Sequence, residues 1–326
     1  MDSPWRGSLV IIAVCTFLLV TLGLLVTLPA ASPAPTGPPE GASGEPDTFA
    51  KATPARTADQ TPPPVAAWST PLGDRPASQA LSLRDCRDVV IENKTFRDLG
   101  PNVIAIRIEN CSNVTIRAVD FINVAQGIVV SDSSNVIVRE TRYSNIIGPH
   151  ARVGLNRGNL VQLVNVAGGL IAWNKGKGGD TEDIVSIYKS HDVIVEDNHF
   201  EGTAAATSTS GCGIGLSDEG GTHNIARRNV LLNPGACGIF IAGGTNNEIA
   251  DNIVYGEARP PANVGIYVWN QSSKACSGNT VSGNRVNWLN ANGDPNPFWD
   301  AKNCDATWIN NDWAASLDVE LLRVRL

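Results

Sequence analysis

Three carboxylates stand within four consecutive residues of the segment GGDTED, at Asp180, Glu182 and Asp183. Carboxylates this close together can ionise at different pH values, so that one serves as an acid and another as a base. Carboxylate oxygens are also the ligands that Ca²⁺ prefers. The cluster therefore predicts an acid–base centre or a Ca²⁺ site, and a solvated polar turn is the alternative.

Tyr188 and Lys189 follow this cluster at the end of the next apolar run. Removal of a proton beside a carboxylate requires a base, together with a cation that neutralises the carboxylate. Tyrosine and lysine can fill these two roles. We therefore count Tyr188 and Lys189 with the three carboxylates as candidate catalytic residues.

Two short strand patterns alternate along the chain and must position these residues. One begins with Asn or Asp, as in NVTIRA, NVIVRE and DVIVED, and the other often begins with Gly, as in GIVVSD, GIGLSD and GIFIAG. Copies of the second pattern start 22 to 33 residues apart, between residues 105 and 265. Short strands joined by turns need about this length for one coil, and stacking of coils buries one continuous core. The pattern predicts an all-β fold, a right-handed single-stranded parallel β-helix.

Alternation within the second pattern turns every other side chain toward the core. The predicted inward columns are Ile106, Ile128, Val161, Val185, Ile214, Ile239 and Ile266, and beside them Ile108, Val130, Leu163, Ile187, Leu216, Ile241 and Val268. The same register aligns Asp218 with Lys189 on the preceding coil, which predicts an ion pair between them. It also separates Asp183 from Asp218 by about 15 to 20 Å, which is too far for the two carboxyl groups of a glycosidase.

The outward positions of the same pattern are polar and carry aromatic side chains. Polar side chains can hydrogen-bond sugar hydroxyls, while Tyr and Trp cover the apolar face of a sugar ring. The residues expected to bind substrate are Arg107, Gln162, Asp218, Tyr267, Trp269 and Asn270. An ordinary solvated sheet face is the alternative interpretation.

Long segments between the two patterns carry basic side chains. They supply His150, Arg152, Arg157, Lys175, Lys177 and Arg259. Insertions on one face of a repeat fold usually mark its binding side, and a basic rim on an acidic protein suggests an anionic ligand. The expected partner is a polysaccharide with anionic groups.

Six cysteines lie outside the apolar N-terminal segment. Cys86 and Cys111 share one register on successive coils, and so do Cys212 and Cys237. Stacked positions are ~4.8 Å apart, which is within the Cα separation of a disulfide. Cys86–Cys111 and Cys212–Cys237 are therefore predicted, and Cys276–Cys304 follows by elimination; buried free thiols are the alternative. No Cys-x-x-Cys motif is present to indicate a metal site.

Composition divides the chain into three parts. Residues 8–28 carry no charge and are long enough to cross a bilayer, so residues 1–29 are expected to be a signal peptide or a signal-anchor helix. Residues 30–79 are a Pro/Ala/Thr-rich linker, and residues 80–326 form the β-helix with a C-terminal cap. The expected location is extracytoplasmic, secreted or held to the membrane by the uncleaved helix. The net charge of −7 argues against a nucleic-acid partner.

The coil repeats resemble the pectin lyase-like superfamily over about residues 80–311. The segment TEDIVSI is similar to a polygalacturonase segment in which two acidic residues open a strand, and those residues are Glu182 and Asp183 here. The Gly-His-Gly of that family is Gly-Cys-Gly here, at residues 211–213. The resemblance implies an enzyme that acts on a uronic-acid-containing glycan by lyase, epimerase or hydrolase chemistry. A non-catalytic carbohydrate-binding or cell-surface module is the alternative.

Overall fold

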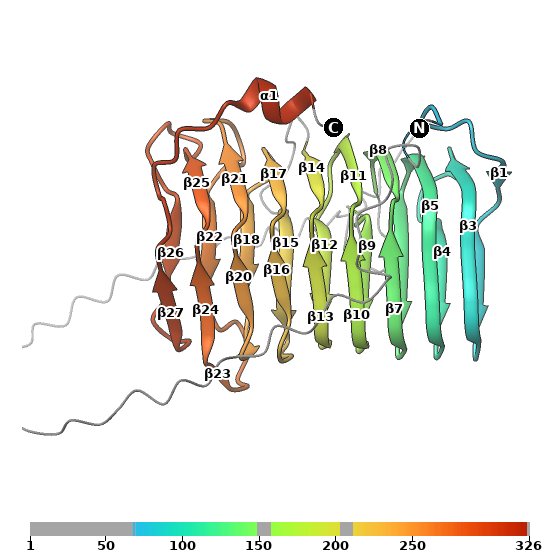
Figure 1. Ribbon diagram of the computed structural model, residues 1–326, viewed down its shortest axis with the longest axis horizontal. Helices are drawn as coiled ribbons and strands as arrows, with labels where there is room; N and C mark the ends of the chain where they lie inside the picture. Colours follow the sequence, from blue (N-terminus) through green and yellow to red (C-terminus); the bar gives the residue numbers. More distant parts are fainter. Residues whose placement is uncertain (1–67, 69, 149–157, 203–210, 325–326) are drawn as a thin grey trace, which may run out of the picture. The chain divides into compact units, whose positions relative to one another are not determined.

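Parallel strands stack along one axis in the part of the chain that the computed structural model describes, residues 68, 70–148, 158–202 and 211–324 (Figure 1). One sheet has nine strands. In spatial order they are β2 (Leu81–Arg84), β4 (Ile104–Glu109), β6 (Gln126–Ser131), β9 (Val161–Val164), β12 (Asp183–Tyr188), β15 (Cys212–Asp218), β18 (Cys237–Ile241), β22 (Val264–Val268) and β26 (Phe298–Asp300).

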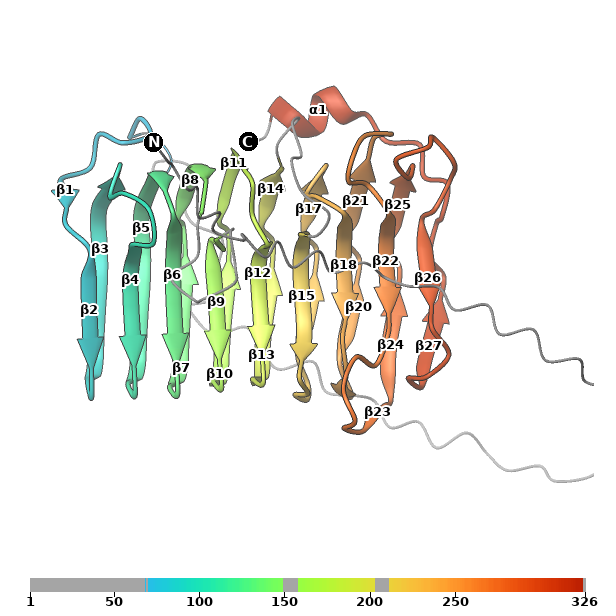
Figure 2. The same cartoon turned by 180° about the vertical axis from the view of Figure 1, so that it is seen from behind.

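The second sheet has sixteen strands in the described ranges. Two long strands, β3 (Arg87–Arg97) and β5 (Ser112–Val124), span both rows of this sheet, since β5 pairs with a lower strand through residues 112–117 and with an upper strand through residues 120–124. The lower row continues with β7 (Ser134–Arg139), β10 (Ala167–Ala172), β13 (His191–Glu196), β16 (Ile225–Arg227), β20 (Glu248–Ala250), β24 (Asn279–Ser282) and β27 (Ala306–Ile309) (Figure 2). Its upper row contains β8 (Arg142–Ile146), β11 (Lys175–Gly179), β14 (His199–Glu201), β17 (Val230–Leu232), β21 (Ile253–Gly256) and β25 (Arg285–Trp288). Strand β1 (Ala77–Ser78) pairs with the upper part of β3.

Every pairing within these sheets is parallel, and each strand pairs with its counterparts on the coils before and after it, as in a β-helix. A small sheet of β19 (Gly244–Thr245) and β23 (Cys276–Ser277) lies in the turns, and helix α1 (Val319–Val324) follows the last coil. The predicted parallel β-helix is confirmed.

The two predicted aliphatic columns form the center of the core. Val185 pairs with Val161 on one side and with Ile214 on the other, and all three side chains are fully buried. The remaining residues of both columns are also fully buried. Because one side chain of every two enters this core, the next side chain in each strand must face outward.

The predicted register is wrong at Asp218. A bulge at the end of β15 places Tyr188, and not Lys189, opposite Asp218. Ser217 takes a left-handed backbone conformation with φ of 58°, which inserts one extra residue into this strand. The expected ion pair between Asp218 and Lys189 is absent among the described contacts, and the Lys189 ammonium group lies 4.9 Å from the centre of the Tyr188 ring.

The three predicted disulfides are confirmed. Cys86–Cys111 and Cys212–Cys237 join stacked positions with Cα separations of 4.5 Å, and Cys276–Cys304 has a separation of 4.8 Å. Each bond closes a loop of one coil, 25 to 28 residues in length. Closing such a loop in the unfolded chain is worth about 3 to 4 kcal/mol in the chain-entropy account.

Asparagines, all buried except the half-buried last one, form a ladder at the turn between the two rows of the larger sheet. The ladder runs through Asn174, Asn198, Asn229, Asn252, Asn284 and Asn311. At each step the side-chain amide and the backbone N–H of one asparagine donate to the Oδ1 of the next. The left-handed positions belong to the preceding residues, such as Asp197 and Arg228, so these asparagines serve the core and do not supply the turn conformation.

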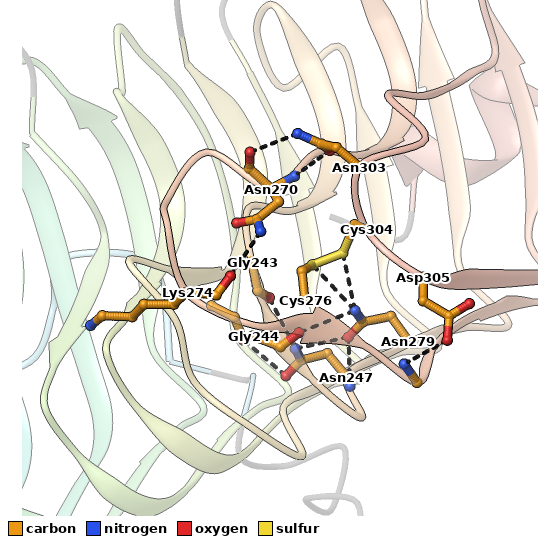
Figure 3. The surroundings of a disulfide bond; sticks show 12 residues. Gly243, Gly244, Asn247, Asn270, Lys274, Cys276, Asn279, Asn303, Cys304 and Asp305 are labelled. Carbon is orange, nitrogen blue, oxygen red and sulfur yellow. Dashed lines mark hydrogen bonds between the residues drawn. A yellow bond between two sulfur atoms is a disulfide. The ribbon is translucent and has the colours of Figure 1, made fainter.

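A second ladder of asparagines ends on a disulfide (Figure 3). Asn224 donates its backbone N–H to Asn247, and Asn247 donates to Asn279. The Nδ2 of Asn279 lies 3.2 Å from the Sγ of Cys304. The disulfide therefore closes the polar column at the last coils, where no further asparagine follows.

Residues 70–76 lie against the first coils and are held there by a buried carboxylate. Asp120 is fully buried and accepts hydrogen bonds from Arg75, from Arg142 and from the backbone N–H of Gly73. Arg142 also donates to the carbonyl of Thr70. Two cations and a backbone amide share one carboxylate, so we call this arrangement the Asp120 clamp.

The apolar segment 8–28 lies outside the residues that the structure describes, as does most of the predicted linker. Within the described residues, no helix is long and apolar enough to span a bilayer.

Replacing Asn229 with alanine is expected to lower the free energy of unfolding of the full chain by about 2 to 3 kcal/mol, because the buried N–H groups of Asn198 and the carbonyl of Val195 lose their partner. Urea unfolding followed by circular dichroism measures the change. Asn292→Ala, at an exposed loop position, is the control and should change stability by less than about 0.5 kcal/mol. Equal stabilities for the two variants would show that the ladder contributes nothing.

Candidate functional site

Aromatic side chains form a row on the outer face of the nine-stranded sheet, at its last coils. Phe240, Tyr267 and Trp299 occupy one outward register on β18, β22 and β26. The rings of Phe240 and Tyr267 stack with centroids 5.1 Å apart and an interplanar angle of 4°. Parallel strands place equivalent side chains ~4.8 Å apart, so stacked rings are the natural packing for neighbouring aromatic residues.

A glycine on the preceding coil makes room for this row. Gly215 is the residue of β15 that pairs with Phe240. A Cβ atom at Gly215 would stand 2.4 Å from the Phe240 ring and 3.2 Å from the Oδ2 of Asp183. The missing side chain therefore lets Phe240 lean toward Asp183, which brings the acidic and aromatic residues together.

A cavity of about 210 Å³ opens beside the row. Its lining residues are all uncharged: Gly211, Cys212, Ala236, Cys237, Asn263, Val264, Tyr267, Trp269 and Trp299. The rings of Trp269 and Trp299 pack edge to face with centroids 5.8 Å apart, and the two residues remain 41% and 46% exposed to solvent. Two large indole rings held in water beside a cavity are typical of a ligand-binding surface. We call Phe240, Tyr267, Trp269 and Trp299 with this cavity the aromatic site.

Two carboxylates lie near the aromatic site and impose a negative electrostatic field on Tyr267, one at the start of β12 and the other at the end of β15. Asp183 begins β12, and its Oδ1 accepts the backbone N–H of Cys212 at 3.1 Å. Asp218 ends β15. Burial, followed by the negative charges of Asp183 and Asp218, raises the pKa of the Tyr267 hydroxyl. The hydroxyl therefore stays protonated and can donate to a ligand, while the amide of Gln271 donates to it at 3.3 Å.

The carboxyl group of Asp218 also has an altered pKa. Burial raises this pKa, and the charge of Glu219 raises it further. A backbone hydrogen bond from Glu219 and the charge of Lys189 lower it, but burial has the largest effect. Asp218 is therefore the carboxyl group near the aromatic site that holds its proton to a higher pH than an ordinary aspartate.

Four of the predicted residues meet here and others do not. Asp183, Asp218, Tyr267 and Trp269 lie at or around the aromatic site. Arg107 on β4 and Gln162 on β9 lie on the same sheet, but six and four strands away from β22, about 29 and 19 Å at ~4.8 Å per strand. Arg107 contacts Glu109 there, and Gln162 is buried.

Asn270 follows β22 and helps to build a turn. Its backbone N–H donates to the side chain of Asn303, and its Nδ2 donates to the carbonyl of Lys274 (Figure 3). These bonds give Asn270 a structural role at the edge of the aromatic site, and contact with a ligand stays a prediction.

The remaining catalytic candidates lie around β12. The backbone N–H of Asp180 donates to the carbonyl of Ile146, and the backbone N–H of Glu182 donates to the carbonyl of Gly158. Tyr188 is the last residue of β12 and Lys189 follows it, so both lie at the other end of the strand. The described residues contain no group of three or more His, Cys, Asp or Glu side chains able to hold a metal ion. Asp180, Glu182 and Asp183 thus do not form such a group, and the Ca²⁺ site stays a prediction.

Those residues of the predicted basic rim that the structure describes do not gather at the aromatic site. His150, Arg152 and Arg157 lie outside the described residues. Lys175 and Lys177 belong to β11 of the larger sheet, because residues 175–179 form a strand where a loop was expected. Arg259 donates to the carbonyl of Asn233.

Trp299 and Asn263 are site residues that the sequence patterns missed. Trp299 lies in the segment PFWD, which has neither the leading glycine nor the aliphatic alternation of the other copies. Its inward neighbour is Phe298, whose ring stacks on Trp313 at 4.6 Å and covers the open end of the core. Recognising PFWD as a last, capping strand would have identified Trp299.

Comparison with known proteins gives a family match and distant structural similarities. A family model described as a right handed beta helix region matches residues 104–286. No curated protein matches the chain. The tailspike protein of E. coli bacteriophage HK620, solved in complex with a pentasaccharide, is 13% identical with a TM-score of 0.47, and the match covers 71% of this chain and 47% of that one.

A second similar structure is PfbA, a surface adhesin of Streptococcus pneumoniae. It is 13% identical with a TM-score of 0.39, and the match covers 72% of this chain and 70% of that one. The present chain spans less than half the length of the tailspike that it matches.

At pH 7, the Asp218→Asn chain is expected to unfold at a higher urea concentration than the native chain. A raised pKa means that the charged carboxylate is less favourable in the folded chain than in the unfolded one, so it reduces stability once the pH exceeds the unfolded value of about 3.9. The two unfolding midpoints should therefore converge as the pH falls to about 3. Asp294→Asn, at an exposed turn, is the control and should not change the midpoint. A native chain more stable than Asp218→Asn at pH 7 would contradict the assignment.

Proposed function

Because the chain belongs to the right-handed β-helix family, whose coils display equivalent residues in rows, we propose that it binds a neutral polysaccharide at the aromatic site. The observation that carries this proposal is the pair of exposed indole rings, Trp269 and Trp299, beside an uncharged cavity. Sugar rings have an apolar face of C–H groups that packs on an aromatic ring and an edge of hydroxyls that needs hydrogen bonds. Tyr267 and Asn263 line the same cavity, and their hydroxyl and amide groups are of the kind that supply those bonds.

Electrostatics favours a neutral sugar over a uronate. Asp183 and Asp218 both disfavour a further negative charge at the Tyr267 hydroxyl. The carboxylate of a uronic acid bound there would meet the same repulsion. Lys175, Lys177 and Arg259, which supported an anionic polymer in the sequence, lie elsewhere. The proposed partner is therefore a polysaccharide without acid groups at the residues that enter the aromatic site.

Turnover of the bound glycan is a second candidate function. The raised pKa of Asp218 favours it, because a carboxyl group that loses its proton at a higher pH than an ordinary aspartate is better suited to act as a general acid. Asp180, Glu182 or Asp183 would supply the carboxylate, and Tyr188 and Lys189 are the candidates for proton abstraction and charge neutralisation. Asp183 and Asp218 stand at opposite ends of β12 and its neighbour, about 16 Å apart along the strand. These are backbone positions, and the Oδ2 of Asp183 reaches toward Gly215, three residues before Asp218, so the two carboxyl groups lie closer than their backbones. Binding is favoured over turnover because it rests on the exposed indoles beside the cavity, which need no catalytic pair of carboxyl groups.

Removing both indoles should weaken polysaccharide binding at least tenfold. The full chain and its Trp269→Ala/Trp299→Ala variant would be titrated with neutral and uronate-containing polysaccharides in affinity electrophoresis. The native chain is expected to be retarded by a neutral polymer, and the variant should bind it at least tenfold more weakly, since each buried Trp contact contributes on the order of 1.5 to 3 kcal/mol. Arg107→Ala, on the same sheet but about 29 Å away, is the control and should bind normally.

The same samples separate binding from turnover. Release of reducing ends or of unsaturated products, lost in Asp218→Asn with binding retained, would support the second candidate function. Retardation by uronate polymers in preference to neutral ones, or normal binding by the double Trp variant, would overturn the proposal of a neutral glycan site.

A further inference from the structure

A second cavity lies on the larger sheet, over β8 and β11, and its lining is basic. Its volume is about 270 Å³. Arg142 and Ser144 contribute from β8, and Lys175 and Lys177 contribute from β11. The strands pair in parallel with Lys175 opposite Arg142 and Lys177 opposite Ser144, so the four side chains occupy neighbouring positions on one outer face.

A glycine between the two lysines forms the floor of this cavity. Gly176 occupies an inward register, next to Tyr143 on one side and Phe200 on the other. A Cβ atom at Gly176 would stand 2.5 Å from the Tyr143 ring, so the buried tyrosine occupies the space of the missing side chain. Leu72 from the N-terminal segment and Arg323 from α1 form the rim. The cavity therefore combines cationic walls with an apolar floor and an apolar edge.

The positive charges in this cavity are unequally compensated. Arg142 shares the carboxylate of Asp120 with Arg75, so one negative charge serves two cations. Arg323 is compensated by glutamates, among them Glu201 at 2.8 Å. In the described part of the chain, neither Lys175 nor Lys177 has a carboxylate within ion-pair distance. The ammonium group of Lys175 lies 4.9 Å from the centre of the Trp68 ring.

Lys175 is in addition partly removed from water. Burial lowers the pKa of its ammonium group, and the positive charge of Arg142 lowers it further. A cation that is desolvated, repelled by a neighbouring cation and left without a carboxylate gains from an anionic ligand. Such a ligand would restore the pKa of Lys175 toward its ordinary value.

We propose that this basic cavity binds a small molecule that carries an oxyanion group, a carboxylate or a phosphate ester, on a body no larger than a monosaccharide. Lys175 and Lys177 neutralise the oxyanion, and the Ser144 hydroxyl donates a hydrogen bond to it. The carbon body rests against Leu72 and the floor at Gly176. The proposal is independent of the aromatic site, which lies on the other sheet and is lined by uncharged residues.

Calorimetric titration of the full chain tests the proposal. The probes are inorganic phosphate, glucose 6-phosphate and glucuronate, at low ionic strength. At least one is expected to bind, and Lys175→Gln/Lys177→Gln should weaken that binding at least tenfold while Lys175→Arg/Lys177→Arg retains it. Lys94→Gln/Lys302→Gln, which removes two lysines from other surfaces, is the matched control and should bind normally. The ratio of the glucose 6-phosphate and glucuronate affinities identifies the oxyanion.

Two further readouts separate this cavity from the aromatic site and from general charge effects. The Trp269→Ala/Trp299→Ala variant should bind the anion normally, so failure of one proposal leaves the other intact. Affinity should fall as the pH rises toward the ordinary lysine pKa of about 10.4, and the fall should begin at a lower pH than for a solvated lysine, because burial and Arg142 lower the pKa of Lys175. No binding of any of the three probes up to 10 mM, roughly the limit at which such affinities are measurable, or equal binding by the lysine-to-glutamine variant, would overturn the proposal.

Discussion

Exact stacking of each coil on the next is the constraint on which the rest of the structure depends. A single coil cannot bury its aliphatic side chains or satisfy its strand hydrogen bonds, so it is stable only between neighbours. Two kinds of interaction fix the register. Aliphatic columns, such as the one through Val161, Val185 and Ile214, resist a shift because a one-residue slip would turn every side chain outward. Asparagine ladders fix the register more sharply, since a hydrogen bond tolerates little displacement.

Both cavities are consequences of this repetition and of the glycines that interrupt it. Outward positions repeat along the stack, so equivalent side chains on neighbouring coils form rows. A row can form a binding site when its side chains are of one type, such as aromatic or basic. Phe240, Tyr267 and Trp299 form such a row, and the absence of a side chain at Gly215 leaves room for the Phe240 ring. At Gly176 the missing side chain makes room for the buried Tyr143 ring beneath two outward lysines. In both places a missing Cβ shapes the site, while the neighbouring side chains supply its chemistry.

The coil period made the fold predictable from the sequence, and it also explains which parts of the site were predictable. Residues in regular copies, such as Tyr267 and Trp269, were placed on the correct face because their strand repeats the pattern. Asp218 was displaced by one residue, because the bulge at Ser217 depends on local backbone conformation and leaves no mark in an apolar pattern. Lys175 and Lys177 were assigned to a loop because the strand KGKGG has no apolar side chain at all. This segment is a strand because its backbone pairs with β8 and β14 on the neighbouring coils, and such long-range pairing cannot be read from the local sequence.

The Asp120 clamp has a geometric consequence for anything joined to the N-terminal side of the fold. It fixes the entry of the chain at β5 and β8, whereas the indole pair stands at the opposite end of the stack, on and beside β22 and β26 (Figure 1). Five coil spacings separate β6, on the coil of β8, from β22, which is about 24 Å of rigid ladder. The solenoid thus acts as a rigid spacer, because its stacked coils hold the Asp120 clamp and the aromatic site apart at a constant distance.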